Sequence, residues 1–332
     1  MIMHPGVLAL FTGSLLTSAM ILYAGWYGVR ILRNWDLSSG SELQLALEKR
    51  TYLISTLLTY ALGFELISLF LFVFTADRLH LLFSGAMCAA GTLNANGFGY
   101  PLLILKLVNF LLAGIWLIVN HADNQGYDYP LIRFKYLLLV PLVPWSLLEF
   151  SYLFAYFSGL HADVITSCCG SLFSLERPGI AGDLASLPVE PMRLAFFGTL
   201  AATLVSGLYS WRSGKGCYPF AVLSLATLLV SLASLVSFIC LYIYQLPSHH
   251  CPFCILQGEY HYLGYPIYAT LLGGALAGMG TGFLHPWRRR GSLSRAIPRL
   301  QRRLAATSVL LFAVFLAIAS YQMIFSPFRL GR

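Results

Sequence analysis

The sequence predicts an all-α polytopic membrane protein, a bundle of about eight transmembrane helices with both termini outside. Of the 332 residues, 58% are hydrophobic and 10% are charged, whereas soluble domains carry about 25% charged residues. Apolar runs of about 20 residues recur along the chain, and this is the length that crosses a hydrocarbon core about 30 Å thick. The composition excludes a soluble globular domain, a disordered chain and a small disulfide scaffold.

The predicted spans cover residues 7–29, 52–75, 102–120, 136–157, 192–211, 218–245, 263–284 and 305–325. Each is expected to be a helix, because backbone hydrogen bonds in lipid have to be made within the segment. Residues 40–50 are too polar to span and predict a short amphipathic helix on the inner surface. Residues 158–191 form the longest outer loop, which is too small for an independent core. Residues 1–332 are therefore interpreted as a single integral membrane domain.

The loops differ in their content of Lys and Arg. Fifteen of the 21 basic residues fall in the loops on one side, five fall on the other side, and Lys106 lies within a span. Cytoplasmic loops carry the excess of basic residues in membrane proteins. The distribution therefore predicts that the basic loops face the cytoplasm and that both termini lie outside. We expect the membrane to be a bacterial inner (plasma) membrane. Membrane lipid, and no nucleic acid, is the expected partner of the basic loops, since no basic stripe with interleaved aromatic residues is present.

Five of the seven cysteines fall on the predicted outer side: Cys88, Cys168, Cys169, Cys251 and Cys254. The space outside a bacterial inner membrane is oxidising, so these positions favour thiol chemistry. Adjacent cysteines close only a strained ring with each other. Cys168 and Cys169 are therefore expected to pair elsewhere or to bind a thiophilic metal. Together with Cys88, they are candidates for a second, exchanging group of thiols.

The most informative motif is His-His-Cys-Pro-Phe-Cys-Ile-Leu-Gln at residues 249–257. Proline is favoured at the first position of a helix, so Pro252 predicts that Cys251 lies at or near the N-cap of the seventh membrane helix. Free backbone N–H groups and the helix dipole stabilise a thiolate there. Cys254, one turn away, would resolve a mixed disulfide. A structural disulfide and a soft-metal site are the alternatives for this pair.

The stretch Cys-Pro-Phe-Cys-Ile-Leu-Gln resembles the Cys-Pro-x-Cys-Ile-x-Gln stretch of the DsbB family of quinone-dependent disulfide-forming membrane proteins. It is also similar to the CxxC of the related vitamin K epoxide reductase family. In these families the CxxC opens a membrane helix on the outer side and passes electrons to a quinone. The resemblance implies that Cys251 and Cys254 form the quinone-linked pair of this chain.

Three ionisable side chains are predicted within spans: Glu65, Lys106 and Glu149. Such residues are costly in lipid, are usually paired and are candidates for function. A cluster of the three would carry protons from a redox site or hold the head group of a quinone. A buried structural ion pair is the alternative.

These features predict a membrane thiol–disulfide oxidoreductase that passes electrons from extracytoplasmic thiols, presented by a thiol protein, to a membrane quinone. The first alternative is the binding or transport of a soft metal such as Cu(I), an ion that thiolates select. Its candidate ligands are Cys88, Cys168, Cys169, His249, His250, Cys251 and Cys254. The second alternative is a structural membrane subunit of an electron-transfer complex.

Overall fold

The computed structural model describes residues 3–36, 40–161, 164–166, 173 and 180–328. Within these described residues, eight helices are long and apolar enough to cross a membrane, which confirms the predicted all-α membrane fold class. The described residues form no strand. The chain divides into two compact units. One comprises Met1–Thr75, Asn96–His161 and Trp287–Ile297, and the other comprises Ala76–Ala95, Ala162–Pro286 and Pro298–Arg332.

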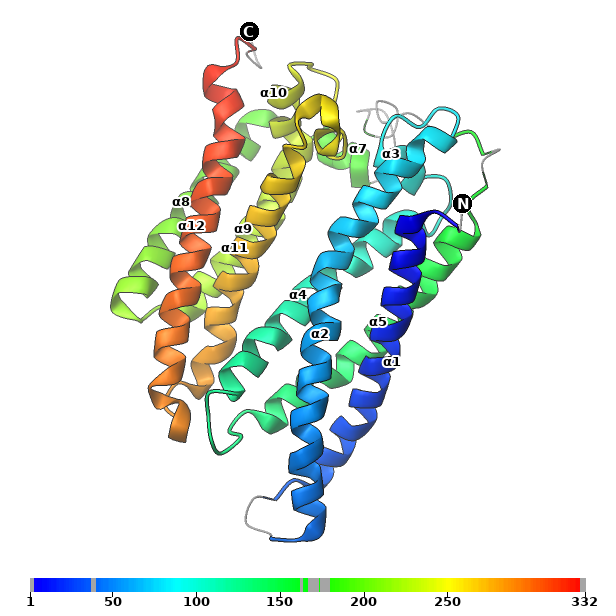
Figure 1. Cartoon of the computed structure of the whole chain (residues 1–332). Helices are drawn as coiled ribbons and strands as arrows, with labels where there is room; N and C mark the ends of the chain where they lie inside the picture. Colours follow the sequence, from blue (N-terminus) through cyan, green and yellow to red (C-terminus); the bar gives the residue numbers. More distant parts are fainter. Residues whose placement is uncertain (1–2, 37–39, 162–163, 167–172, 174–179, 329–332) are drawn as a thin grey trace. The chain divides into compact units, whose positions relative to one another are not determined.

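The first unit contains most of four long helices (Figure 1). They are α1 (Pro5–Asn34), α2 (Glu42–Leu79), α4 (Gly99–Asp123) and α5 (Ile132–Ser158). α5 packs against both α1 and α4, and its Tyr136 side chain is buried in one core together with Trp116 of α4. α1 approaches α5 closely at Gly28, which has no Cβ. A Cβ added there would lie 3.0 Å from the Tyr136 ring.

The start of α2 lies in the segment predicted as a short amphipathic helix leading into the second span, residues 40–50. α2 is one continuous helix from Glu42, drawn in blue in Figure 1. Leu47 is buried in the core of the first unit, and the side-chain carbonyl of the buried Gln44 accepts a hydrogen bond of 3.1 Å from the backbone N–H of Asp36. The polar composition of residues 40–50 gave no sign that one face of this segment is buried in the first unit.

The second unit contains most of the other long helices and three short ones. They are α3 (Ala89–Leu93), α7 (Ile180–Ala185), α8 (Val189–Ser213), α9 (Cys217–Ser234), α10 (Cys240–Tyr244), α11 (Gly264–Leu284) and α12 (Ala296–Phe325). A π-helical turn, Leu235–Ile239, joins α9 to α10, so the two form one spanning segment.

Glycines bring α9 and α11 close together in the second unit. Gly274, Gly278 and Gly282 recur every four residues on α11, and the sequence predicts a face that packs closely against other helices. A Cβ at Gly278 would clash with Ser224 of α9, and a Cβ at Gly282 would lie 2.6 Å from the Ala221 Cβ. The close packing is therefore confirmed.

Candidate functional site: a three-cysteine cluster

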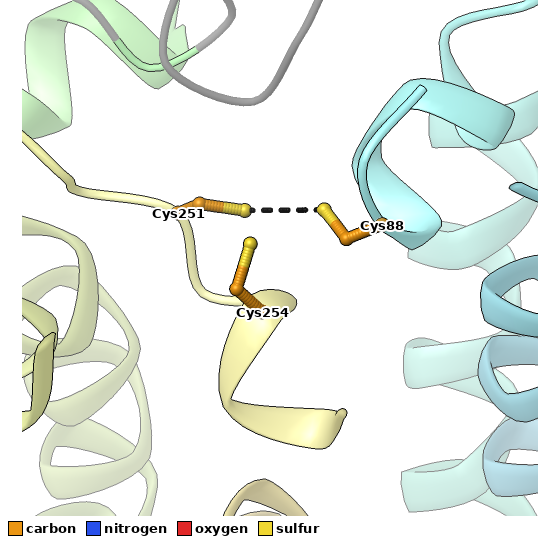
Figure 2. Close-up of side chains that lie close together, drawn as sticks. All are labelled: Cys88, Cys251 and Cys254. Carbon is orange, nitrogen blue, oxygen red and sulfur yellow. Dashed lines mark hydrogen bonds between the residues drawn. The ribbon is translucent and has the colours of Figure 1, made fainter. Parts of the chain in front are cut away.

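Two segments of the second unit bring three sulfur atoms together (Figure 2). Cys88 immediately precedes α3, and Cys251 and Cys254 lie in the connection between α10 and α11. The three Sγ atoms all lie within 4.8 Å of one another. The Cys88 and Cys251 Sγ atoms are 3.6 Å apart although the residues are separated by 163 positions in the chain. The sequence predicted that Cys88, grouped with Cys168 and Cys169, exchanges with the Cys251–Cys254 pair, but it could not specify this contact.

The CxxC does not open the seventh membrane helix, so the prediction of an N-cap position for Cys251 is wrong. Residues 254–256 form a single 3-10 turn, and α11 begins only at Gly264. The φ angles of His261 and Tyr262 are 54° and 55°, which is the left-handed region and ends any helix running through these residues. Pro266 instead lies in the first turn of α11, a position that suits proline.

Tyrosine hydroxyls hold the backbone of the CxxC segment. The Tyr244 hydroxyl donates to the Cys251 carbonyl oxygen at 2.6 Å, and the Tyr268 hydroxyl donates to the Pro252 carbonyl oxygen at 2.8 Å. These tyrosines belong to α10 and α11, the helices on either side of the segment. The CxxC therefore has a fixed backbone even though it is outside a regular helix.

The two histidines that precede the CxxC have different environments. His250 is buried, and its Nδ1 lies 2.9 Å from the Val236 carbonyl oxygen in the π-helical turn. Because a carbonyl oxygen only accepts, Nδ1 carries the proton there. The His249 Nε2 atom lies 3.4 Å from the Cys254 Sγ atom. His249 is therefore the histidine that can exchange a proton with a thiol of the cluster.

The three sulfur atoms are shielded from solvent. Cys88 and Cys251 are 0% exposed and Cys254 is 5% exposed. The described residues therefore leave these sulfur atoms accessible mainly to other groups of the protein itself.

The predicted candidates Cys168 and Cys169 lie outside the described residues. Described residues on either side of them contact both cysteine-bearing segments. The Thr166 N–H donates to the Ser84 carbonyl oxygen at 3.0 Å, and the ring centroids of Phe173 and Phe253 are 6.4 Å apart.

In the first unit, the three ionisable residues predicted within spans lie together. The Lys106 Nζ atom is 2.6 Å from Glu149 Oε1 and 3.1 Å from Ser68 Oγ. The Asn109 amide donates to Glu65 Oε2 at 3.2 Å and also to Glu149. None of these side chains is more than slightly exposed. The cluster combines two carboxyl groups with one ammonium group, so it is neutral when one carboxyl group holds a proton.

A second buried ion pair in the first unit was missed from the sequence. The Lys135 Nζ atom lies 2.8 Å from Asp123 Oδ2 and bonds to Ser55 and Asn120. Lys135 is one of the fifteen basic residues that the sequence places in the loops of one side, but it lies within α5 and is 1% exposed. Asp123 lies just after the predicted span 102–120 and Lys135 just before the predicted span 136–157, where charges usually meet headgroups, so hydropathy alone gave no signal of their burial.

No protein-family model matches this chain, and no curated protein or solved structure is similar to it.

Proposed function

We propose that this protein is a membrane thiol–disulfide oxidoreductase in which Cys88, Cys251 and Cys254 exchange one disulfide. The observation that carries the proposal is the 3.6 Å separation between the Cys88 and Cys251 sulfur atoms, with Cys254 in the same cluster. Disulfide exchange requires an attacking, a central and a leaving sulfur. The cluster supplies one residue for each role.

In the proposed step, a Cys88 thiolate attacks the Cys251 sulfur of a Cys251–Cys254 disulfide. The Cys88–Cys251 bond forms, the Cys251–Cys254 bond breaks, and Cys254 leaves with the electron pair as a thiolate. His249 lies 3.4 Å from the leaving sulfur, so its protonated imidazole would stabilise that thiolate or donate a proton to it. The reverse step regenerates the starting disulfide.

Net oxidation requires an external electron acceptor, for which we propose a membrane quinone. One dithiol and one quinone give one disulfide and one quinol, with two electrons and two protons transferred. The resemblance of residues 251–257 to quinone-dependent disulfide-forming proteins supports this acceptor. The electron donor would be an extracytoplasmic thiol protein, with Cys168 and Cys169 as the cysteines that meet it.

The charged cluster of the first unit is the proposed site for the quinone head group. Lys106 and Asn109 carry N–H donors that suit a quinone carbonyl oxygen, and Glu65 and Glu149 would hold the protons that quinol formation consumes. This site and the cysteine cluster belong to different units, so separate variants have to test them.

Soft-metal binding is the second candidate function, and the mutual distances of the sulfur atoms favour it. Three thiolates around one ion at about 2.3 Å would have sulfur atoms about 4 Å apart, and the sulfur atoms of Cys88, Cys251 and Cys254 lie within 4.8 Å of one another. Soft thiolate ligands suit Cu(I), the ion proposed for this site. The two functions predict different states of the sulfur atoms. Thiol exchange requires a disulfide within the cluster, whereas the metal site requires three reduced sulfur atoms.

The test is to trap the thiols in intact cells with an alkylating reagent, purify the protein, and measure both disulfides and bound copper. Thiol exchange predicts a disulfide within the cluster that mild reduction opens, with no stoichiometric metal. Three reduced thiols together with one copper ion per chain would instead establish the metal site. Cys217→Ser is the matched control, because Cys217 is a buried cysteine near Ser210, outside the cluster.

A further inference from the structure

Side chains from two other segments hold the residues on both sides of Cys88. The backbone N–H of Ala89, the residue after Cys88, donates to Asp77 Oδ1 at 3.2 Å. The carbonyl oxygen of Met87, the residue before Cys88, accepts from Gln257 Nε2 at 2.8 Å. The same amide nitrogen lies 3.3 Å from Asp77 Oδ1. The two side chains therefore contact each other as well as the backbone around Cys88.

The bonds of Gln257 join the two cysteine-bearing segments. Gln257 follows Cys254 by three residues and lies on the CxxC side of the cluster, whereas Asp77 and Met87 lie on the Cys88 side. An amide nitrogen has two hydrogen atoms, and here one points to a carbonyl oxygen and the other to a carboxylate. A bond to a charged acceptor is stronger than one between neutral groups.

Asp77 also replaces the side chain that would ordinarily cap α3. Cys88 is the N-cap residue of α3 and makes no capping bond with its own side chain. The orphan N–H groups at a helix start favour a negatively charged acceptor, and the Asp77 carboxylate takes the first of them. The Cys88 sulfur is therefore not needed as a cap, and it contacts Cys251 instead.

We propose that Asp77 and Gln257 are positioning residues that hold Cys88 within exchange distance of Cys251. This inference rests on the proposed thiol exchange for its functional meaning. Neither side chain takes part in the exchange. They hold the backbone on both sides of Cys88. This raises the effective concentration of the Cys88 sulfur at the Cys251 sulfur.

The test measures disulfide formation between Cys88 and Cys251 alone. The parent protein is the full chain carrying Cys254→Ser, Cys168→Ser and Cys169→Ser, purified in detergent and reduced. Diamide, a diazene that removes two electrons and two protons, then oxidises the remaining cluster thiols, and mass spectrometry of the unreduced digest follows the rate. Equilibration with glutathione redox buffers gives the effective concentration of the two thiols.

Gln257→Glu is the most informative variant, since it keeps the shape of the side chain but replaces the donating amide nitrogen with a carboxylate oxygen that faces the acceptors of Asp77 and Met87. We expect disulfide formation at least about tenfold slower and an equilibrium shift of at least about tenfold, which is about 30 mV for a two-electron couple. Asp77→Asn keeps an oxygen for Ala89 and is expected within about twofold of the parent. The double variant Gln257→Glu with Asp77→Asn is expected to recover part of the loss, because an asparagine amide can donate to the new carboxylate.

A Gln257→Glu rate and equilibrium within twofold of the parent would overturn the positioning role. Equal losses in the single and double Gln257 variants would overturn it as well. Unchanged thermal unfolding of these variants separates positioning from unfolding. A parent that forms no Cys88–Cys251 disulfide would overturn both this inference and the proposed exchange. A parent that forms it, beside an unsubstituted protein without any quinone turnover, would leave the positioning role standing and contradict the proposed function alone.

Discussion

Replacing Lys106 with Met removes the only ammonium group of the buried cluster in the first unit. The Lys106 Nζ atom lies 2.6 Å from Glu149 Oε1, and both side chains are at most 2% exposed. The replacement leaves a buried carboxylate without its counter-charge. Breaking a buried ion pair from one side costs about 3–5 kcal/mol, so we expect the unfolding free energy to fall by about that amount.

The double variant Lys106→Met with Glu149→Gln removes both charges and leaves an amide that can still bond to Asn109. We expect it to be more stable than the single Lys106→Met variant by about 2 kcal/mol or more, because both partners of the ion pair are removed together. Unfolding in mixed micelles of a mild detergent and sodium dodecyl sulfate measures both changes. Lys215→Met is the control, since Lys215 is exposed in the connection between α8 and α9. Additive losses in the double variant, or a Lys106→Met protein as stable as the control, would contradict a buried ion pair between Lys106 and Glu149.

Two further predictions concern the second unit. Gly278→Ala places a Cβ against Ser224 and is expected to lower the unfolding free energy by about 1–3 kcal/mol. Gly198→Ala, where a Cβ meets nothing within 4 Å, should have little effect or stabilise slightly, and equal effects at the two positions would contradict the packing of α11. His249→Phe removes the imidazole from Cys254 and should slow thiol exchange by about 100-fold or more, measured as the rate of mixed-disulfide resolution. A rate within threefold of the unsubstituted protein would show that His249 takes no part in the exchange.

Hydropathy was sufficient to predict the membrane helices, because whether a segment enters lipid depends on its own composition. The same reasoning identified Glu65, Lys106 and Glu149, since an ionisable residue inside an apolar run needs a partner. It failed at the span ends. Lys135 was placed in a loop although it pairs with Asp123 inside the first unit, because a charge at the end of a span has the same local sequence whether it meets water or protein.

The cysteine cluster shows a different limit of the sequence. The motif at residues 249–257 indicated the chemistry but not the backbone, because the left-handed residues His261 and Tyr262 that delay α11 have no glycine to mark them. The contact between Cys88 and Cys251 joins segments 163 positions apart, and tertiary packing alone determines it. Gln257 belongs to the motif, but its hydrogen bonds to Asp77 and Met87 depend on the fold and could not be predicted from the sequence.

The most direct test of the proposed function is the rate of quinol formation by the purified protein supplied with a small dithiol and a soluble quinone. Quinone-linked thiol exchange predicts turnover by the unsubstituted protein and by the Cys217→Ser control. It predicts only background reduction of the quinone by Cys251→Ser. Equal rates in all three proteins, or no turnover by an unsubstituted protein whose cluster thiols are reduced, would contradict it.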